Sequence, residues 1–165
     1  GTPVLLVGVL RLDQWPLRVE QWLARDYPEE AGVLLGLARH AARYRTWVTF
    51  NGKSFDGPML RDRCTVWRRP LVEPRVHVDV LHAARARWRG KLPDCRLGTL
   101  EQCLLGIRRT GDVPGRDVPD LLHHFVRTGN AAPLRGVLEH NRQDLASSAA
   151  LLARLGEAAR PAGGP

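Results

Sequence analysis

The chain has 165 residues, enough to bury one hydrophobic core, and its 25 lysine and arginine residues exceed 17 acidic residues for a formal net charge of +8. Three cysteines without a C-x-x-C pair argue against a disulfide framework and a zinc ribbon, and fit buried thiols of a cytoplasmic protein. No apolar stretch approaches the roughly 20 residues of a membrane helix, so we expect no membrane partner. The charge suits an anionic partner such as nucleic acid, although a solvated arginine-rich surface explains it equally well.

The first half of the chain predicts strands separated by helices. Residues 3–12 and 17–23 are apolar or alternating runs on either side of "DQWP", which is typical of a hairpin. Residues 28–44 carry two glutamates in the first turn and apolar side chains at helical spacing, and so predict an amphipathic helix. A short buried strand over 45–50 follows, and then a helix after Asp56, marked by residues at helical spacing up to Trp67.

The second half is mainly helical. Residues 75–88 predict a brief strand that runs into a helix, and residues 97–106 predict a short helix with Thr99 as its cap and Gly106 at its end. Residues 108–120 have the composition of a surface loop, and helices are expected over about 118–127 and 133–155. We therefore expect one α/β domain over residues 1–156 with a mixed sheet, and a flexible tail over 157–165.

The stretch "TFNGKSFDGPML" places Asp56 where a buried strand gives way to a helix. A carboxylate at the end of a strand suits a metal site. An aspartate before Gly-Pro is also a good helix cap, and this ordinary role explains the residue well when it is taken alone.

His140 and Asp144 lie four residues apart on the last long helix, and so on one face of it. A rotation of about 100° per residue places this pair on the shoulder of the predicted buried stripe. An imidazole and a carboxylate so placed can share a water molecule, although a surface His/Asp pair is the simpler explanation. The stripe itself consists of Leu134, Leu138, Asn141, Leu145 and Leu152.

Two carboxylates, Asp56 at a strand end and Asp144 on a distant helix, suit a hard divalent cation such as Mg²⁺. Two such ions about 4 Å apart activate a water molecule and stabilise the leaving oxygen of a phosphodiester. This interpretation gives Asp56 a role beyond capping.

Six stretches occur in a characteristic order: "VTFNGKSFDGPML", "HVDVLHAAR", "LGTLEQCLLGIRR", "DVPGRDVPDLL", "RTGN" and "VLEHNRQDLASSAALL". Together they cover nearly the whole chain and resemble the YprB-type ribonuclease H-like domain, a branch of the DEDD 3′ to 5′ exonuclease superfamily. "NGKSFD" is similar to the second exonuclease motif, N-x-x-x-F-D. "HNRQD" is similar to the third motif, with His in place of the usual Tyr of Y-x-x-x-D.

The resemblance implies a ribonuclease H-like fold, a mixed five-stranded sheet flanked by helices, with acidic residues around two Mg²⁺ or Mn²⁺ ions. It implies that Asp56 and Asp144 are metal ligands and catalytic residues, and that His140 orients or deprotonates the attacking water.

Other residues of the second motif are implied to bind nucleic acid, with a single-stranded 3′ end as the expected substrate. Asn51 and Phe55 would shape the site near the terminal nucleotide, and Lys53 would contact a phosphate. Asp79 in "HVDVLH" is an acidic neighbour for which we expect a structural role.

The first motif of that superfamily, D-x-E on the central strand, has no match in this sequence. Asp13 follows its strand instead of lying on it, and Gly1 to Gly8 resemble the segment that comes after the first motif in family members. We therefore expect the chain to begin beyond its first motif and to lack the first central strand. The strands at 3–12 and 45–50 would then lack their common neighbour, and cleavage would be impaired.

Two functions from different classes stay open. The first is a metal-dependent 3′ to 5′ exonuclease domain, and the second is a nuclease-dead domain that binds nucleic acid or assists a helicase partner. No G-x-x-x-x-G-K-[ST] loop or G-x-S-x-G elbow supports another phosphoryl-transfer enzyme or a serine hydrolase. The sequence does not separate DNA from RNA as the substrate.

Overall fold

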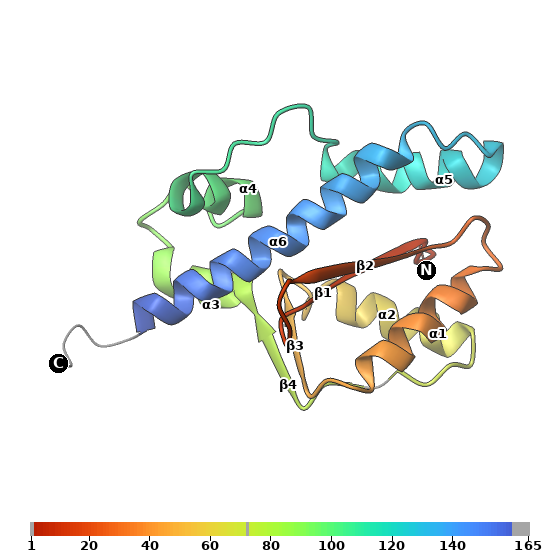
Figure 1. Cartoon of the computed structure of the whole chain (residues 1–165), viewed down its shortest axis with the longest axis horizontal. Helices are drawn as coiled ribbons and strands as arrows, with labels where there is room; N and C mark the ends of the chain where they lie inside the picture. The colour runs from red at the N-terminus through yellow and green to blue at the C-terminus, as the bar shows by residue number, and fades with distance from the viewer. Residues whose placement is uncertain (1, 72, 160–165) are drawn as a thin grey trace.

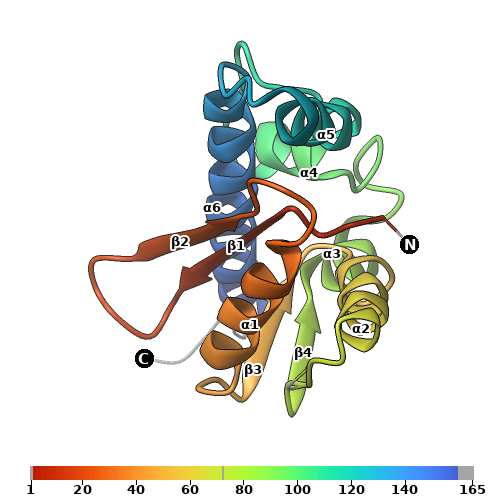
Figure 2. The ribbon, with the colours of Figure 1, turned by 90° about the vertical axis from the view of Figure 1, so that its right-hand side faces the viewer.

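The computed structural model describes residues 2–71 and 73–159 of the chain. It opens with an antiparallel hairpin formed by β1 (Leu6–Arg11) and β2 (Arg18–Leu23), whose register pairs Leu6 with Leu23 and Arg11 with Arg18. The hairpin predicted from the two apolar runs is confirmed. Figure 2 shows its turn reaching out beyond the other strands, and the side chain of Trp15 in this turn is 87% exposed.

A second pair of strands is parallel. β3 (Thr46–Thr49) pairs with β4 (Val76–Asp79), and α2 (Asp56–Val66) lies in the crossover between them, as a parallel pair requires. In the described residues β1 pairs only with β2, and β3 only with β4. The α/β class is confirmed. The strands form two two-stranded sheets, one antiparallel and one parallel, and in the described residues β1 and β3 share no neighbouring strand.

The remaining elements are helical. The long helix α6 passes between the hairpin on one side and α4 and α5 on the other (Figure 1). The helix α6 spans Leu134–Ala159. The other helical elements besides α2 are α1 (Glu30–Ala41), α3 (Val80–Trp88), α4 (Leu97–Leu100), a π-helical turn (Glu101–Leu105), a 3₁₀ turn (Gly115–Asp117) and α5 (Val118–Thr128).

The long helix joins two hydrophobic cores. Its first turns place Leu134 and Val137 in a core with the start of the chain, α1, α2 and α5. Its later turns place Leu151 in a second core with α3 and α4. The polar middle of α6, from His140 to Ser147, lies between the two cores. Apart from the exposed Arg142, the polar side chains of this stretch are half-buried or buried, because the residues on either side of it pack into the two cores.

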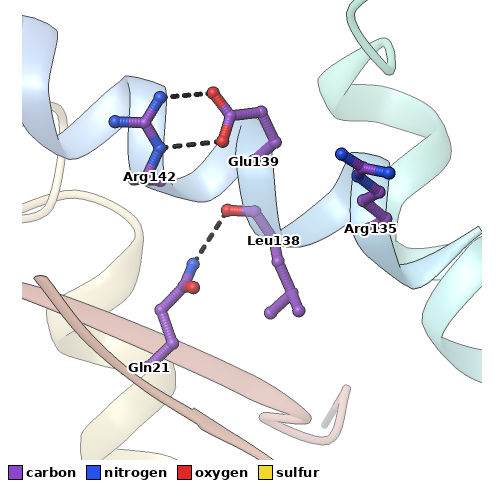
Figure 3. A pocket seen from close by; sticks show the side chains of 5 residues that line it. All are labelled: Gln21, Arg135, Leu138, Glu139 and Arg142. Atoms are coloured by element: carbon purple, nitrogen blue, oxygen red, sulfur yellow. Dashed lines mark hydrogen bonds and ion pairs between the residues drawn. The ribbon is translucent and has the colours of Figure 1, made fainter.

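The hairpin packs closely against α6. A Cβ atom added at Gly8 of β1 would lie 2.0 Å from Oδ1 of Asn141, so only glycine fits at this contact. The side-chain amide of Gln21 on β2 donates to the carbonyl of Leu138 at 2.9 Å and to Oδ1 of Asn141 at 2.8 Å. Figure 3 shows Gln21 reaching from the strand to the helix.

The predicted buried stripe of α6 was wrong in its orientation. The most buried residues in the described part of this helix are Leu134, Val137, Ser147 and Leu151, whereas Leu138, Asn141, Leu145 and Leu152 are half-buried. The reason is that α6 packs on two sides. The face expected to be a shoulder, with His140 and Asp144, adjoins the most buried positions.

Three smaller expectations also need correction. Thr99 lies inside α4 and the N-cap position belongs to Arg96, although Gly106 does end the helical segment with a left-handed φ of 69°. Cys64 is buried as expected, but Cys103 is exposed. Residues 157–159 of the expected tail belong to α6, and residues 160–165 lie outside the described part of the chain.

Candidate functional site

The second-motif segment is a tight turn between β3 and α2. Asn51 takes a left-handed φ of 64°, which asparagine tolerates better than most residues, and its carbonyl accepts the N–H groups of Ser54 and Phe55. A Cβ atom at Gly52 would lie 2.4 Å from Cβ of Thr49, so the turn closes only with glycine. This geometry explains why the stretch reads "NG" before the helix.

Two neighbouring side chains at the end of the turn differ in exposure. The side chain of Phe55 is exposed, at 62%, while Asp56 is half-buried. Lys53 is exposed near Phe55 on the same turn. The turn therefore presents an aromatic face and a cation to solvent, and holds a carboxylate inside.

Asp56 does not cap its helix. It is the first residue of α2, the N-cap position belongs to Phe55, and no side-chain capping bond is formed there. Burial, and then the negative charge of Asp79, raise the pKa of Asp56 above its ordinary value. The capping explanation is thus contradicted, and the carboxylate is held where its charged form is unfavourable.

Asp79 has the structural role expected of it. This buried carboxylate at the end of β4 accepts the backbone N–H groups of Asn51 at 2.9 Å, Lys53 at 3.0 Å and Leu81 at 3.1 Å. It therefore fixes the second-motif turn and caps α3. Burial raises the pKa of Asp79, but the hydrogen bonds from Lys53 and Asn51 lower it by more, so the net shift is downward.

The third-motif residues meet on α6. Nε2 of His140 lies 3.4 Å from Oδ2 of Asp144, and Nδ1 of His140 lies 3.0 Å from both carboxylate oxygens of Asp112. The imidazole thus lies between two carboxylates. Its side chain is 16% exposed, and that of Asp144 is 39% exposed.

Arg109 lies at the centre of this group. Its guanidinium donates to Glu101, Asp112 and Asp144, with the shortest distances 2.5, 2.9 and 2.6 Å respectively. Ser147 of α6 also donates to the buried carboxylate of Glu101. We name the residues Glu101, Arg109, Asp112, His140 and Asp144 the Arg109 cluster.

The sequence analysis did not identify Glu101, Arg109 or Asp112 as site residues. It assigned the segment after residue 107 to a surface loop, because contacts between residues 35 positions apart leave no periodic pattern. One signal was present: Glu101 is a charged residue inside the apolar run "TLEQCLL", and such a residue needs a buried partner.

The two motifs form separate groups in this structure. Asp56 interacts electrostatically with Asp79, whereas Asp144 belongs to the Arg109 cluster. In the described residues no group of three or more His, Cys, Asp or Glu side chains is arranged to hold a metal ion. Asp56 fits a metal ligand, but Oδ1 of Asp144 is already taken by a guanidinium. The described residues therefore show no assembled metal site, and Asp56 and Oδ2 of Asp144 are the oxygens that remain for a metal ion.

Two depressions flank these residues. One, of about 520 Å³, runs between residues 2–6, α2 and α5, and Phe55 lies on its lining. The other, of about 320 Å³, lies between Gln21 and α6, where Arg142 is paired with Glu139 and Arg135 is exposed (Figure 3). At about 100° per residue it lies on the face of α6 opposite the third-motif pair.

Comparison with known proteins identifies the family of the chain. The family model of the RNase H superfamily matches residues 1–156. The chain is 35% identical over 149 residues to the uncharacterized protein YprB of Bacillus subtilis strain 168, an alignment that covers 89% of this chain and 36% of that relative. The chain thus spans little more than a third of the length of the curated relative. No helix in the described residues is long and apolar enough to cross a membrane.

Proposed function

The chain belongs to the RNase H superfamily, and on this basis we propose that it is a metal-dependent 3′ to 5′ exonuclease domain acting on single-stranded ends of nucleic acid. Nucleases of this superfamily use divalent metals. The observation that best supports the proposal is Asp56, a half-buried carboxylate with a raised pKa in the second-motif turn that makes no helix cap. Half-buried carboxylates with a raised pKa and no structural partner are candidates for functional sites.

We propose the roles that the two sequence motifs imply. Asp56 would be a ligand of Mg²⁺ or Mn²⁺, and Asp144 would offer Oδ2, since its other oxygen contacts Arg109. His140 would orient or deprotonate the attacking water, because its Nε2 faces Asp144. The bound metal would supply water activation and stabilisation of the leaving oxygen.

The second-motif turn would hold the terminal nucleotide. Phe55 offers an exposed aromatic face for a base, Lys53 offers a charge to a phosphate, and the backbone of Asn51 sets the shape of the turn. Stacking and phosphate contacts serve DNA and RNA alike, so the proposal covers both polymers.

Cleavage is expected to be impaired in the 165-residue chain. Only two of the four carboxylates of a DEDD site have counterparts in its sequence, and the described residues hold no assembled metal cluster.

A second function is favoured by the cation beside Asp144. The guanidinium of Arg109, 2.6 Å from Asp144, neutralises the negative charge that a metal ion would otherwise neutralise. With the net charge of +8, this supports a nuclease-dead domain that binds nucleic acid or assists a helicase partner within the cytoplasm.

A cleavage assay separates the two functions. End-labelled single-stranded DNA and RNA are incubated with the chain, and with a longer form if in-frame coding sequence precedes the Gly1 codon, in Mg²⁺, Mn²⁺ or EDTA. The exonuclease proposal expects stepwise loss from the 3′ end in metal, abolished by Asp56→Asn and Asp144→Asn. Asp62→Asn, an exposed change on the same helix as Asp56, is the matched control.

Digestion that persists in EDTA would contradict metal dependence. Binding without cleavage in any form, unchanged by Asp56→Asn, would establish the second function instead.

A further inference from the structure

The Arg109 cluster contains a guanidinium that cannot readily leave. Nε and Nη2 of Arg109 hold both carboxylate oxygens of Glu101, at 2.9 and 2.5 Å, and the Glu101 side chain is 1% exposed. Withdrawal of Arg109 would leave the buried carboxylate of Glu101 without its cation, which is strongly unfavourable. Arg109 is therefore a fixed part of the protein, in contrast to the many surface arginines of this chain.

The same guanidinium sets two other side chains. Nη2 donates to Oδ1 of Asp144 at 2.6 Å, which leaves Oδ2 directed at His140. Nη1 donates to Oδ2 of Asp112 at 2.9 Å, and Asp112 in turn holds Nδ1 of His140 at 3.0 Å. One side chain thus controls the carboxylate on each edge of the imidazole ring.

This arrangement determines which ring nitrogen of His140 carries the proton. Both oxygens of Asp112 lie 3.0 Å from Nδ1 of His140, closer than Nη1 of Arg109 at 3.5 Å and closer than Oδ2 of Asp144 is to Nε2, at 3.4 Å. A carboxylate accepts but cannot donate, so the shorter contact favours a proton on Nδ1 and leaves Nε2 facing Asp144. Nε2 then has a lone pair and lies 3.4 Å from Oδ2 of Asp144, so the two acceptors can both accept hydrogen bonds from one water molecule.

We propose that Arg109 is a positioning residue of the third motif, which holds one oxygen of Asp144 and, through Asp112, fixes the tautomer and orientation of His140. This inference rests on the proposed function for the use that is made of His140. The geometry of the cluster is independent of it.

The test observes the His140 ring nitrogens by long-range ¹H–¹⁵N NMR of the chain at one fixed pH. The wild-type chain is expected to show a single tautomer with a proton on Nδ1. In the double variant Glu101→Gln/Arg109→Met, which replaces the buried ion pair without leaving a lone charge, His140 is expected to show the averaged shifts of a free imidazole. Arg109→Lys, which keeps the charge and loses the fork, is expected to give an intermediate result.

Two controls accompany these variants. Arg108→Gln removes the neighbouring exposed arginine and is expected to leave the His140 signals unchanged. The exposed His124, outside the cluster, reports within each spectrum whether any change is general. Circular dichroism and urea unfolding establish that each variant is folded.

Unchanged His140 signals in a folded double variant would overturn the proposal. Should that variant not fold, Asp112→Ala is the second test. Asp112 is the partner of Nδ1 and its side chain is 24% exposed, so the change disturbs the core less. His140 is again expected to show the averaged shifts of a free imidazole. Unchanged signals in Asp112→Ala would equally overturn the proposal.

Activity then separates this inference from the proposed function. In a form that cleaves, the double variant is expected to lower kcat by about 10- to 100-fold with KM nearly unchanged, because Arg109 orients reacting groups and does not bind substrate. If no form cleaves while the NMR result holds, the exonuclease proposal fails and the positioning role stands.

Discussion

Asp56 makes the stability of this protein depend on pH in a direction unusual for a carboxylate. Burial and Asp79 raise its pKa in the folded chain above the unfolded value, so its charged form is less favourable in the folded state. The stability associated with its protonated form is fully present below the unfolded pKa. It is lost as pH rises through the folded pKa.

We therefore predict that Asp56→Asn raises the free energy of unfolding at neutral pH. Urea unfolding of both proteins at about pH 4 and about pH 7 measures the effect, since the unfolded pKa of aspartate is about 3.9. The advantage of the variant should be larger at the higher pH. Asp62→Asn should show no such gain, and an equal gain in both variants would assign the effect to surface charge.

A second buried carboxylate, Glu30, is paired with donors from three parts of the chain. Its oxygens accept the guanidinium of Arg63, Nε1 of Trp67 at 2.7 Å and the backbone N–H of Val4 at 2.7 Å. Burial raises the pKa of Glu30, but these hydrogen bonds lower it by more. Its stabilising effect is thus present above the unfolded pKa and is lost as pH falls through the folded one.

Arg63→Met is predicted to cost about 3–5 kcal/mol of unfolding free energy, because it leaves Glu30 charged and buried. Arg61→Met on the same helix breaks an ion pair whose two side chains are about half exposed, and should cost about 0–1 kcal/mol. Denaturant midpoints of the two variants give the comparison. Similar losses in both would mean that the buried pair contributes no more than a surface pair.

At the scale of elements, the contact between β1 and α6 decides how the hairpin lies on the site helix. Gly8→Ala is predicted to cost about 1–3 kcal/mol, since its Cβ would overlap the side chain of Asn141. Gly32→Ala in α1 meets no atom within 4 Å and should instead stabilise the chain by about 0.5–1 kcal/mol. Thermal unfolding of each variant measures the change in stability. A stabilising Gly8→Ala would show that the hairpin can shift away from the helix.

Local patterns predicted most elements because their causes are local. The hairpin, α2, β4 with α3, and α5 follow from alternation, turn residues and helical spacing, and their bounds lie close to those expected. The burial of α6 was predicted less well, since a helix between two packed layers has no single buried stripe. Asp56, His140 and Asp144 could be named from motif spacing, but the cluster around Arg109 could not. That cluster depends on chain segments brought together only by the completed fold.

At the scale of the whole molecule, nucleic-acid binding and metal binding depend on different features. The chain has a net charge of +8, but its strands form two separate sheets. The charge is spread over the surface, whereas metal ligation needs carboxylates gathered at one point. Binding therefore does not depend on an assembled metal site. We expect the chain to bind single-stranded oligonucleotides in EDTA, with an affinity that falls steeply as salt rises.

Fluorescence anisotropy with a labelled single-stranded oligonucleotide over a range of NaCl concentrations tests this expectation and places the contact. Lys53→Gln should lower the slope of log affinity against log salt by about 1, because it removes one phosphate contact. Phe55→Ala should weaken binding by about 1–3 kcal/mol at every salt concentration, because stacking on a base is largely insensitive to salt. Val66→Ala, a similarly exposed apolar residue at the other end of α2, is the matched control. If all three variants bind like the wild type, nucleic acid binds elsewhere on the basic surface, and the second-motif turn does not hold the strand.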